Sequence, residues 1–500
     1  MKSQFFGGAY QQRSLPLSAQ TCVNLFPKAN QRQGGEMSGF YGTPGREVLT
    51  TLPAGEGRGI CPVGSNQATL IAVVGASVYA VTATTANGNS GSPPITFAYT
   101  LVGTLPTTTG RVSMATNASG QTAICDSTGM YVVANGNGSL GSKVTNGPSG
   151  GQSVIAYMDG FGLFITGGGT NESTSFGITA IDDFTTINAL NVATAEALPD
   201  NLVSVVVTQR EAWLLGNQTA EIWSDTGAAI FPWERIPGGV LHTGCSGLFT
   251  PAFVEDTVFW VTRTPTGKNR VVRTVGYQVE YISDYAVEES LQNYNDSLPG
   301  AETIPPWAYA YQQRGDSFYV LNIPQADITW VYHVNTGLWH RRAYRDSNGV
   351  LHAELSGAYT YWQEQHCILD PNNGNIYKLD DGTYTDNGLP IYRERAWPLV
   401  PPEELHRVRI DRIELDAETG VGNETGTDTT PLVSLEMSFD GGRTFGLSRY
   451  QGLGAIGVYN ARVRWGRCGI GRRPVARIST TAEVKIAWLG ANFDGEILQQ

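Results

Sequence analysis

The pattern of strands and turns is clearest between Arg210 and Glu288. It opens with Glu211-Ala212-Trp213-Leu214-Leu215-Gly216, turns through Asn217-Gln218-Thr219 and returns as Ala220-Glu221-Ile222-Trp223. A second unit runs through Thr257-Val258-Phe259-Trp260-Val261, the loop Pro265-Thr266-Gly267-Lys268-Asn269 and Val271-Val272. Apolar runs of about five residues, bounded by Gly, Asn, Pro or Thr, are typical of β-hairpins. Helical spacing is not sustained, so the stretch predicts antiparallel sheet.

Similar units recur on both sides of this stretch, at residues 68–81, 121–133, 161–180, 317–341 and 367–379. Together with the two hairpin units they are spaced by roughly 40 to 60 residues, which is typical of propeller blades. A lone hairpin cannot bury its apolar faces, and a closed ring removes exposed edges. We therefore expect a β-propeller of about seven blade-like units over residues 60–396.

The segments around these units have a different composition. Three low-complexity loops, at 82–94, 135–151 and 297–306, lack the apolar content of a core and should project from the ring. Residues 1–59 are irregular and rich in Gln, Gly, Pro and Arg. They predict an extended N-terminal arm that either binds a partner or supplies a strand that closes the ring.

A domain boundary is expected at Trp397-Pro398-Leu399-Val400-Pro401-Pro402, because consecutive prolines interrupt strands and helices alike. Beyond it, runs such as Val408–Leu415 and Val484–Trp488 alternate apolar with charged residues. A period of two indicates half-buried antiparallel strands. The whole chain is therefore predicted to be all-β, with a C-terminal β-sandwich over residues 403–500.

Charge is distributed unevenly along the chain, whose formal net charge is -12. Residues 393–500 contain 14 basic and 14 acidic residues, so the preceding part holds 19 basic against 31 acidic residues. Tight binding to DNA phosphates needs a basic face. The chain therefore cannot hold DNA tightly over most of its surface.

The N-terminal region contributes a further pattern: Gly8-Ala9-Tyr10, Arg13-Ser14, Cys22-Val23-Asn24-Leu25-Phe26-Pro27 and Gly42-Thr43-Pro44-Gly45. Together with residues 198–288, this order of residues resembles the tail-hub or nozzle proteins of short-tailed bacteriophages, also called packaged-DNA stabilisation proteins. The resemblance implies six copies that form a tube below the portal and its adaptor ring. Such a tube extends the DNA channel, retains packaged DNA and conducts it during ejection.

The resemblance also implies partners and a location. It implies a homo-hexamer that contacts the adaptor, receives spikes or fibres on its sides and a needle or plug at its tip, and passes DNA without sequence-specific binding. Residues 1–8 lack an apolar stretch long enough for a signal peptide, and no window approaches a membrane span. We therefore expect synthesis and assembly in the bacterial host cytoplasm, and a place in the virion tail without stable membrane insertion.

Two features leave other functions open. The run 438–445, Ser-Phe-Asp-Gly-Gly-Arg-Thr-Phe, resembles the Asp-box turn of sialidases, and Arg235-Ile236-Pro237 matches a tripeptide of the same family. A glycosidase needs a carboxylic acid of raised pKa facing a second carboxylate. The pairs Asp182-Asp183 and Glu288-Glu289 would point to opposite faces if extended. We nominate no catalytic residue and keep a sialidase-like glycosidase, or a non-catalytic glycan-binding propeller, as the alternatives.

No metal or cofactor is predicted. The six cysteines are scattered singly and the six histidines show no dense ligand spacing. Asp370–Gly374 and Asp380–Gly382 are turn sequences first, because the full calcium-loop spacing is missing.

The densest basic group comprises Arg462, Arg464, Arg467, Arg472, Arg473 and Arg477. If Arg462 and Arg464 share a strand face, the group could meet an acidic partner or DNA in a lumen. The alternative is a solvated strand edge protected by charge. The candidate partner contacts are Tyr10, Arg13, Arg462, Arg464, Arg467, Arg472 and Arg473.

Overall fold

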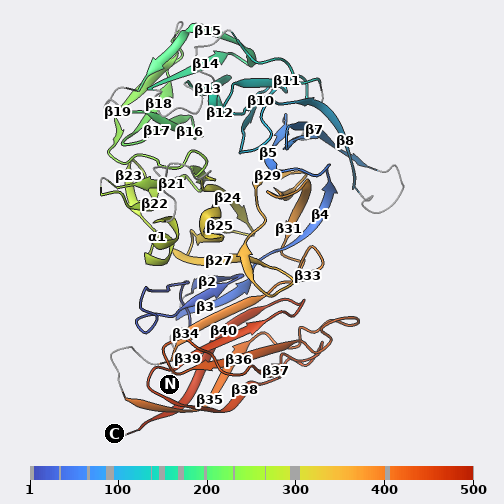
Figure 1. The fold of residues 1–500 in the computed structure, drawn as a ribbon, viewed down its shortest axis with the longest axis vertical. Helices are drawn as coiled ribbons and strands as arrows, with labels where there is room; N and C mark the ends of the chain where they lie inside the picture. The colour runs from blue at the N-terminus through green and yellow to red at the C-terminus, as the bar shows by residue number, and fades with distance from the viewer. Residues whose placement is uncertain are drawn as a thin grey trace.

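The computed structural model describes residues 5–32, 35–64, 68–85, 95–136, 138–145, 152–166, 174–195, 200–228, 231–264, 266–292, 304–399 and 406–498. Within these ranges the chain is almost entirely β, and its helices are α1 (Tyr285–Gln292) and the 3-10 turn η1 (Pro324–Ala326). None is long and apolar enough to cross a membrane. Figure 1 shows a ring of small sheets above a sandwich. Much of the three expected loops (86–94, 137, 146–151 and 297–303) lies outside the described residues.

Within the described residues, seven sheets form the ring, and the predicted β-propeller is confirmed. Blade 1 consists of β5 (Gly57–Val63), β6 (Thr69–Val74), β7 (Ser77–Thr85) and β8 (Ile95–Thr104). Blade 2 consists of β9 (Ser113–Thr116), β10 (Thr122–Cys125) and β11 (Met130–Val133). Blade 3 consists of β12 (Gln152–Met158), β13 (Phe161–Thr166), β14 (Ser175–Ala180) and β15 (Asp183–Thr194). Blade 4 consists of β16 (Leu202–Thr208), β17 (Glu211–Gly216), β18 (Ala220–Asp225) and β19 (Trp233–Leu241).

The remaining blades complete the circle. Blade 5 consists of β20 (Ala252–Val254), β21 (Thr257–Arg263), β22 (Asn269–Val275) and β23 (Gln278–Tyr281). Blade 6 consists of β24 (Trp307–Gln313), β25 (Asp316–Ile323), β26 (Ile328–His333) and β27 (Leu338–Arg345), with β28 (Leu351–Ala353) beside β27. Blade 7 consists of β29 (Ala358–Trp362), β30 (Gln365–Leu369), β31 (Asn375–Asp380) and β4 (Gly45–Thr51), extended by β32 (Thr385–Asp386) and β33 (Leu389–Pro390).

The first hairpin of most blades closes with the same two-residue turn. Both turn residues have positive φ, as in Gln209-Arg210, Glu255-Asp256 and Gln363-Glu364. This backbone twist matches the twist of antiparallel strands, so it fixes the register of each hairpin. The register in turn puts Leu214 and Ile222 of blade 4 in the core.

The ring is closed by the N-terminal part of the chain. Strand β4 pairs antiparallel with β31, while β5, six residues further on, begins blade 1. Blade 7 therefore combines strands from distant parts of the sequence, and the first and last blades are joined covalently. Two alternatives were expected for residues 1–59, a partner-binding arm or a strand that closes the ring. Strand β4 is such a ring-closing strand.

Arg111 connects blades across the ring. Its guanidinium donates to the carbonyl of Gly357 beside blade 7 and lies 4.9 Å from the ring centre of Trp307 in blade 6 and 5.7 Å from that of Phe249. Burial lowers the pKa of Arg111 to about 9. Stacking and hydrogen bonding together offset part of the cost of burying this cation.

The C-terminal domain is a two-sheet sandwich, as predicted. One sheet continues from β27 of blade 6 through β1 (Thr21–Val23), β34 (Arg393–Pro398), β39 (Val475–Thr480), β36 (Leu432–Ser438) and β37 (Arg449–Gly452). The other contains β2 (Leu25–Arg32), β3 (Gly35–Gly42), β40 (Ala487–Leu498), β35 (Arg407–Ala417) and β38 (Val463–Gly471). Alternate residues such as Ile410, Trp465 and Trp488 fill the core between them. Because β34 pairs with β39, the sandwich begins ahead of the expected residue 403.

The segment before β1 is tied to the sandwich by Arg395 on β34. This fully buried side chain donates to the carbonyls of Phe5, Gly8 and Thr21 and to Oε1 of Gln20, at 2.9 to 3.1 Å. All three guanidinium nitrogens are therefore used. The expected irregular arm is instead, from Thr21 to Thr51, four strands paired within this chain.

Candidate functional site

The predicted basic group lies on and around β38, at one side of the sandwich: Arg464 and Arg467 are on this strand, while the other four precede or follow it. Strand β38 is the last strand of its sheet, and β37 is the last strand of the other. The two strands meet where Arg449 donates to the carbonyl of Gly466 at 2.6 Å and accepts from Nε1 of Trp465 at 2.7 Å. Val463, Trp465 and Cys468 point into the core. The alternation places Arg464 on the outside, as the sequence predicted.

The structure divides the six arginines into two sets. Arg462 forms an ion pair with Glu414 at 2.8 Å, and Arg477 is paired with Glu436 and lies 3.9 Å from the ring centre of Phe445. Both are thus engaged within the chain. The other four are exposed and have no carboxylate partner in the described part of the chain; we refer to them as the basic edge: Arg464, Arg467, Arg472 and Arg473.

An exposed apolar surface lies beside the basic edge, and sequence reasoning missed it. Leu447 is 91% exposed and Tyr459 is 76% exposed. They belong to a group that we call the apolar edge, which lies on β36, on β37 and in the loops before and after β37: Leu432, Leu447, Tyr450, Ile456, Val458 and Tyr459. Large exposed apolar side chains are a feature of interaction surfaces. The available signal was the presence of Leu447, Tyr450 and Tyr459 in a glycine-rich segment without strand alternation.

The N-terminal candidates lie on the segment that reaches this region. Tyr10 is 42% exposed and Arg13 is exposed. A few residues further on, Leu15 to Ala19 line a small depression together with Arg472 and Arg473. The structure therefore places this segment beside the basic edge, although no contact joins Tyr10 or Arg13 to those arginines among the described residues.

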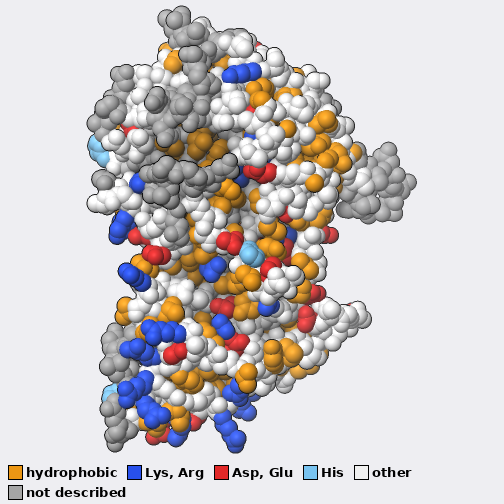
Figure 2. Space-filling model, in the orientation of Figure 1, with side chains coloured by type: hydrophobic (Ala, Val, Ile, Leu, Met, Phe, Trp, Pro, Cys, Tyr) orange, Lys and Arg blue, Asp and Glu red, His pale blue; other side chains and the backbone are white. Residues whose placement is uncertain are grey.

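Figure 2 shows that Lys and Arg side chains are concentrated on the sandwich half of the molecule. Part of this charge is neutralised across strands, since Arg409 pairs with Glu496 at 3.0 Å and Arg412 pairs with Asp494. The basic edge adds unpaired positive charge to the sandwich. Its geometry fits an acidic protein surface that also offers apolar side chains.

The residues that suggested a glycosidase have structural roles. Asp440 accepts hydrogen bonds from the hydroxyls of Ser438 and Thr444 and from the backbone of Arg443, and these bonds hold the pKa of its carboxyl well below the usual range. The Asp-box pattern is thus a turn. Arg235 lies 3.7 Å from Glu221.

The two carboxylate pairs are engaged as well. Asp183 accepts hydrogen bonds from the hydroxyls of Thr185 and Thr186, which favour its charged form, and its pKa is lowered to about 2 although burial opposes this. Glu288 pairs with Arg270 at 2.9 Å. In the described residues, no group of three His, Cys, Asp or Glu side chains is arranged to hold a metal ion.

Two family models match the chain, one for each domain. They are described as "Bacteriophage P22 Gp10, beta-propeller", over residues 1–384, and "Bacteriophage P22 Gp10, beta-sandwich", over residues 392–496. This chain belongs to the bacteriophage P22 Gp10 family. The Gp10 family is that of the tail-hub or nozzle proteins of short-tailed phages, so the chain is a phage tail structural protein. The division between the two Gp10 models falls just before β34.

Other comparisons add little to the Gp10 assignment. Curated proteins give no match. Among solved structures, the computationally designed Ika8 protein has 10% identity, covers 68% of this chain and 100% of its own, and has a TM-score of 0.36. YCF48 from Cyanidioschyzon merolae has 9% identity, covers 67% of this chain and 99% of its own, and has a TM-score of 0.40. Neither likeness carries an argument about function.

Proposed function

We propose that this protein forms the tail hub, or nozzle, below the portal and the adaptor ring of a short-tailed phage. Six copies form a tube that extends the DNA channel, helps to retain packaged DNA and conducts it during ejection. The observation that carries the proposal is the match of both domains to the Gp10 family. The protein acts without catalysis or cofactor, in the virion tail, after assembly in the host cytoplasm.

The open side of the sandwich is our candidate for docking to the adaptor. The basic edge supplies unpaired positive charge and the apolar edge supplies exposed surface, and together they fit an acidic partner with apolar contacts. Charge complementarity of this kind speeds encounter and fixes orientation. The spikes or fibres and the needle or plug would occupy other surfaces of the hub.

The charge distribution supports a conduit that does not grip DNA. The whole net charge of -12 falls on the residues before 393. DNA would therefore pass without sequence-specific binding, because few cations are available to displace its counterions.

The proposal is tested by electron microscopy of DNA-filled, adaptor-capped heads that lack this protein, before and after addition of the purified chain, with released DNA quantified in parallel. We expect new sixfold density below the portal and reduced DNA leakage. Failure to bind together with unchanged DNA loss would refute the hub assignment. Glycan binding and cleavage would then be measured.

A further inference from the structure

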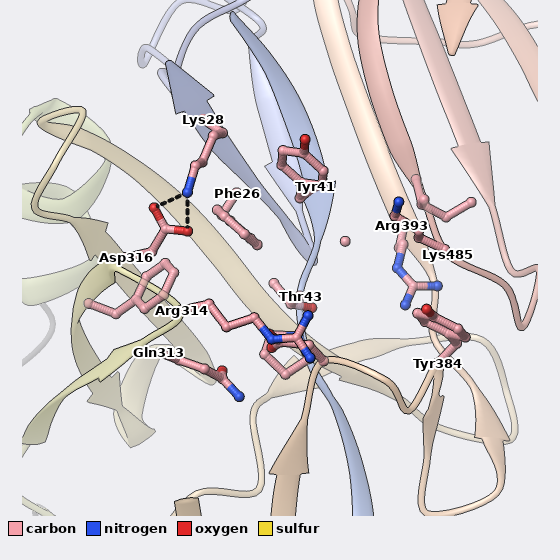
Figure 3. A pocket seen from close by; sticks show the side chains of 15 residues that line it. Phe26, Lys28, Tyr41, Thr43, Gln313, Arg314, Asp316, Tyr384, Arg393 and Lys485 are labelled. Atoms are coloured by element: carbon pink, nitrogen blue, oxygen red, sulfur yellow. Dashed lines mark hydrogen bonds and ion pairs between the residues drawn. The ribbon is translucent and has the colours of Figure 1, made fainter. Parts of the chain in front are cut away.

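A cavity of about 340 Å³ lies at the junction of the propeller and the sandwich (Figure 3). Its walls come from the hairpin β2–β3, the first turn of blade 6, the turn after β31, and β34 with the residue pair 485–486. These segments are far apart in sequence. A ligand held here would contact both domains at once.

The cations that line the cavity are paired, with one exception. Lys28 pairs with Asp316 at 2.7 Å, Arg314 pairs with Asp381 at 2.8 Å, and Lys485 pairs with Glu418 at 2.8 Å. Arg393 has no carboxylate partner among the described residues, and its side chain is fully buried. The cavity therefore contains one uncompensated positive charge.

Arg393 differs from Arg395, which lies two residues along the same strand. Arg395 makes four hydrogen bonds, whereas Arg393 makes one, from Nη1 to the carbonyl of Ala482 at 3.3 Å. The Nε of Arg393 is buried without a partner in the described structure. A buried donor of a charged group without a partner is costly, so an oxyanion that accepted its hydrogen bonds would be stabilising.

The backbone leaves room for this guanidinium. A Cβ at Gly42 would lie 2.8 Å from the Nε of Arg393, so a side chain at residue 42 would displace the arginine. Gly42 lies at the end of β3 and is held by a hydrogen bond from its N–H to the carbonyl of Ile486 at 3.0 Å. The position of Arg393 is thus set by main chain on one side of the cavity.

Further groups in the cavity suit a ligand with an anionic end and an apolar body. The hydroxyls of Tyr41 and Tyr384 make no hydrogen bond within the described residues and are free to donate. Figure 3 shows the guanidinium of Arg393 next to Tyr384 and Lys485, with Arg314 reaching toward the same space. Phe26, Phe318 and Ile486 supply apolar wall. Mostly apolar pockets of a few hundred Å³ with a few convergent polar groups are typical ligand sites.

We propose that this cavity binds a monocarboxylate attached to a short apolar group, such as the acidic side chain or chain end of a partner segment, through Arg393, Tyr384 and Arg314. One unpaired charge matches a monoanion, whereas a phosphate dianion would leave negative charge uncompensated. The planar guanidinium also matches the two oxygens of a carboxylate. Occupancy would fix the sandwich against the propeller.

The test uses the full chain with 3-phenylpropionate as probe and inorganic phosphate as comparison, at pH 7 and equal ionic strength, measured by titration calorimetry and thermal unfolding. We expect saturable binding of 3-phenylpropionate and a rise in Tm of about 1 to 3 °C at ten times Kd. Phosphate should produce less than half of this shift. An equal or larger shift with phosphate would overturn the carboxylate assignment, and no saturable binding of either probe would overturn the site.

Three variants locate the binding. Arg314→Gln changes an exposed side chain and Tyr384→Phe a half-buried one, and each should weaken 3-phenylpropionate binding at least threefold. Arg393→Gln should abolish it. The matched control is Arg210→Gln, since Arg210 is 79% exposed, lies in the equivalent turn of blade 4 and pairs with Asp159, while the side chain of Arg314 is 75% exposed. Binding unchanged in Arg314→Gln and Tyr384→Phe would place the ligand elsewhere and refute the proposal, whether or not Arg393→Gln folds.

Discussion

A single side chain, that of Arg395, holds the N-terminal segment on the sandwich. Replacing it with lysine keeps a positive charge but leaves several of its four carbonyl and amide acceptors without a donor. We expect Arg395→Lys to lower the free energy of unfolding by about 2 to 4 kcal/mol. Denaturant unfolding and hydrogen exchange over residues 5–21 would measure it.

The control for this prediction is Arg409→Lys, because Arg409 is exposed and its ion pairs lie at the surface. Its effect should stay within about 0.5 kcal/mol. Unchanged exchange protection of residues 5–21 in Arg395→Lys would contradict the tethering role.

His340 gives the molecule a pH dependence. Burial, with Arg342 and His333 nearby, lowers its pKa well below the ordinary value of 6.5. As the pH falls below about 6.5, the unfolded state binds the proton while the folded state does not, so stability is full above that pH and declines below it. Neither ring nitrogen has a hydrogen-bond partner among the described residues.

We therefore predict that His340→Phe makes stability less dependent on pH between about 6.5 and 5. As the pH falls, the free energy of unfolding of the wild type should decrease relative to that of the variant by up to about 1.4 kcal/mol per pH unit. Denaturant midpoints at several pH values provide the measurement. Parallel curves for the two proteins would show that the pKa of His340 does not differ between the folded and unfolded states in a way that affects stability in this pH range.

The sequence predicts which face of a strand a side chain occupies, but not which distant residue it pairs with. The alternation of β38 correctly put Arg464 outside and Trp465 inside, because period two is a local property of a strand. It could not reveal that Arg462 is paired, since Glu414 lies 48 residues earlier on a neighbouring strand. The same limit hid Arg393 and Arg395, whose surroundings are assembled from distant segments.

At the element scale, β4 determines whether the ring stays closed. Arg46 on this strand is buried, donates to Asp386 and to the carbonyl of Leu355, and lies 5.2 Å from the ring centre of Tyr377. We expect Arg46→Ala to lower the free energy of unfolding by about 3 kcal/mol, because a buried ion pair loses one partner. In this variant, protection from hydrogen exchange should decrease more in β4 and β31 than in the strands of the other blades.

The matched control is Glu47→Ala on the same strand. Its carboxylate is 64% exposed and lies 3.5 Å from Lys378, so its loss should change stability by less than about 1 kcal/mol. A uniform loss of protection over all blades in Arg46→Ala would refute the idea that the ring opens at blade 7.

Elements differ in how far the sequence predicts them. The blades were predictable because each is a set of adjacent strands separated by turn residues. Strand β1 was not, because its partners, such as Ala396 for Thr21, lie hundreds of residues away. Strands β2 and β3 pair with each other, but they join their sheet only through β40, where Trp488 pairs with Phe40. Pro27 is accommodated within β2 because this strand lies at the edge of its sheet.

At the scale of the whole molecule, the chain separates an acidic propeller from a sandwich whose open side carries unpaired cations. We predict that Arg464→Glu combined with Arg467→Glu weakens binding to adaptor-capped heads at least tenfold. Co-sedimentation at low salt would measure it. The control is Arg210→Glu, an exposed arginine on the propeller that should leave binding unchanged.

The apolar edge should contribute to docking through a different force. Tyr459→Ser combined with Leu447→Ser removes exposed apolar surface without altering charge, so its loss of binding should be similar at low and high salt. The effect of the charge reversals should instead shrink as salt rises from about 0.05 to 0.5 M, because exposed charges are screened. Co-sedimentation of both variants across this range separates the two contributions. If the serine variant bound like wild type at every salt concentration while still folding, docking would rest on charge alone and the apolar edge would face another partner.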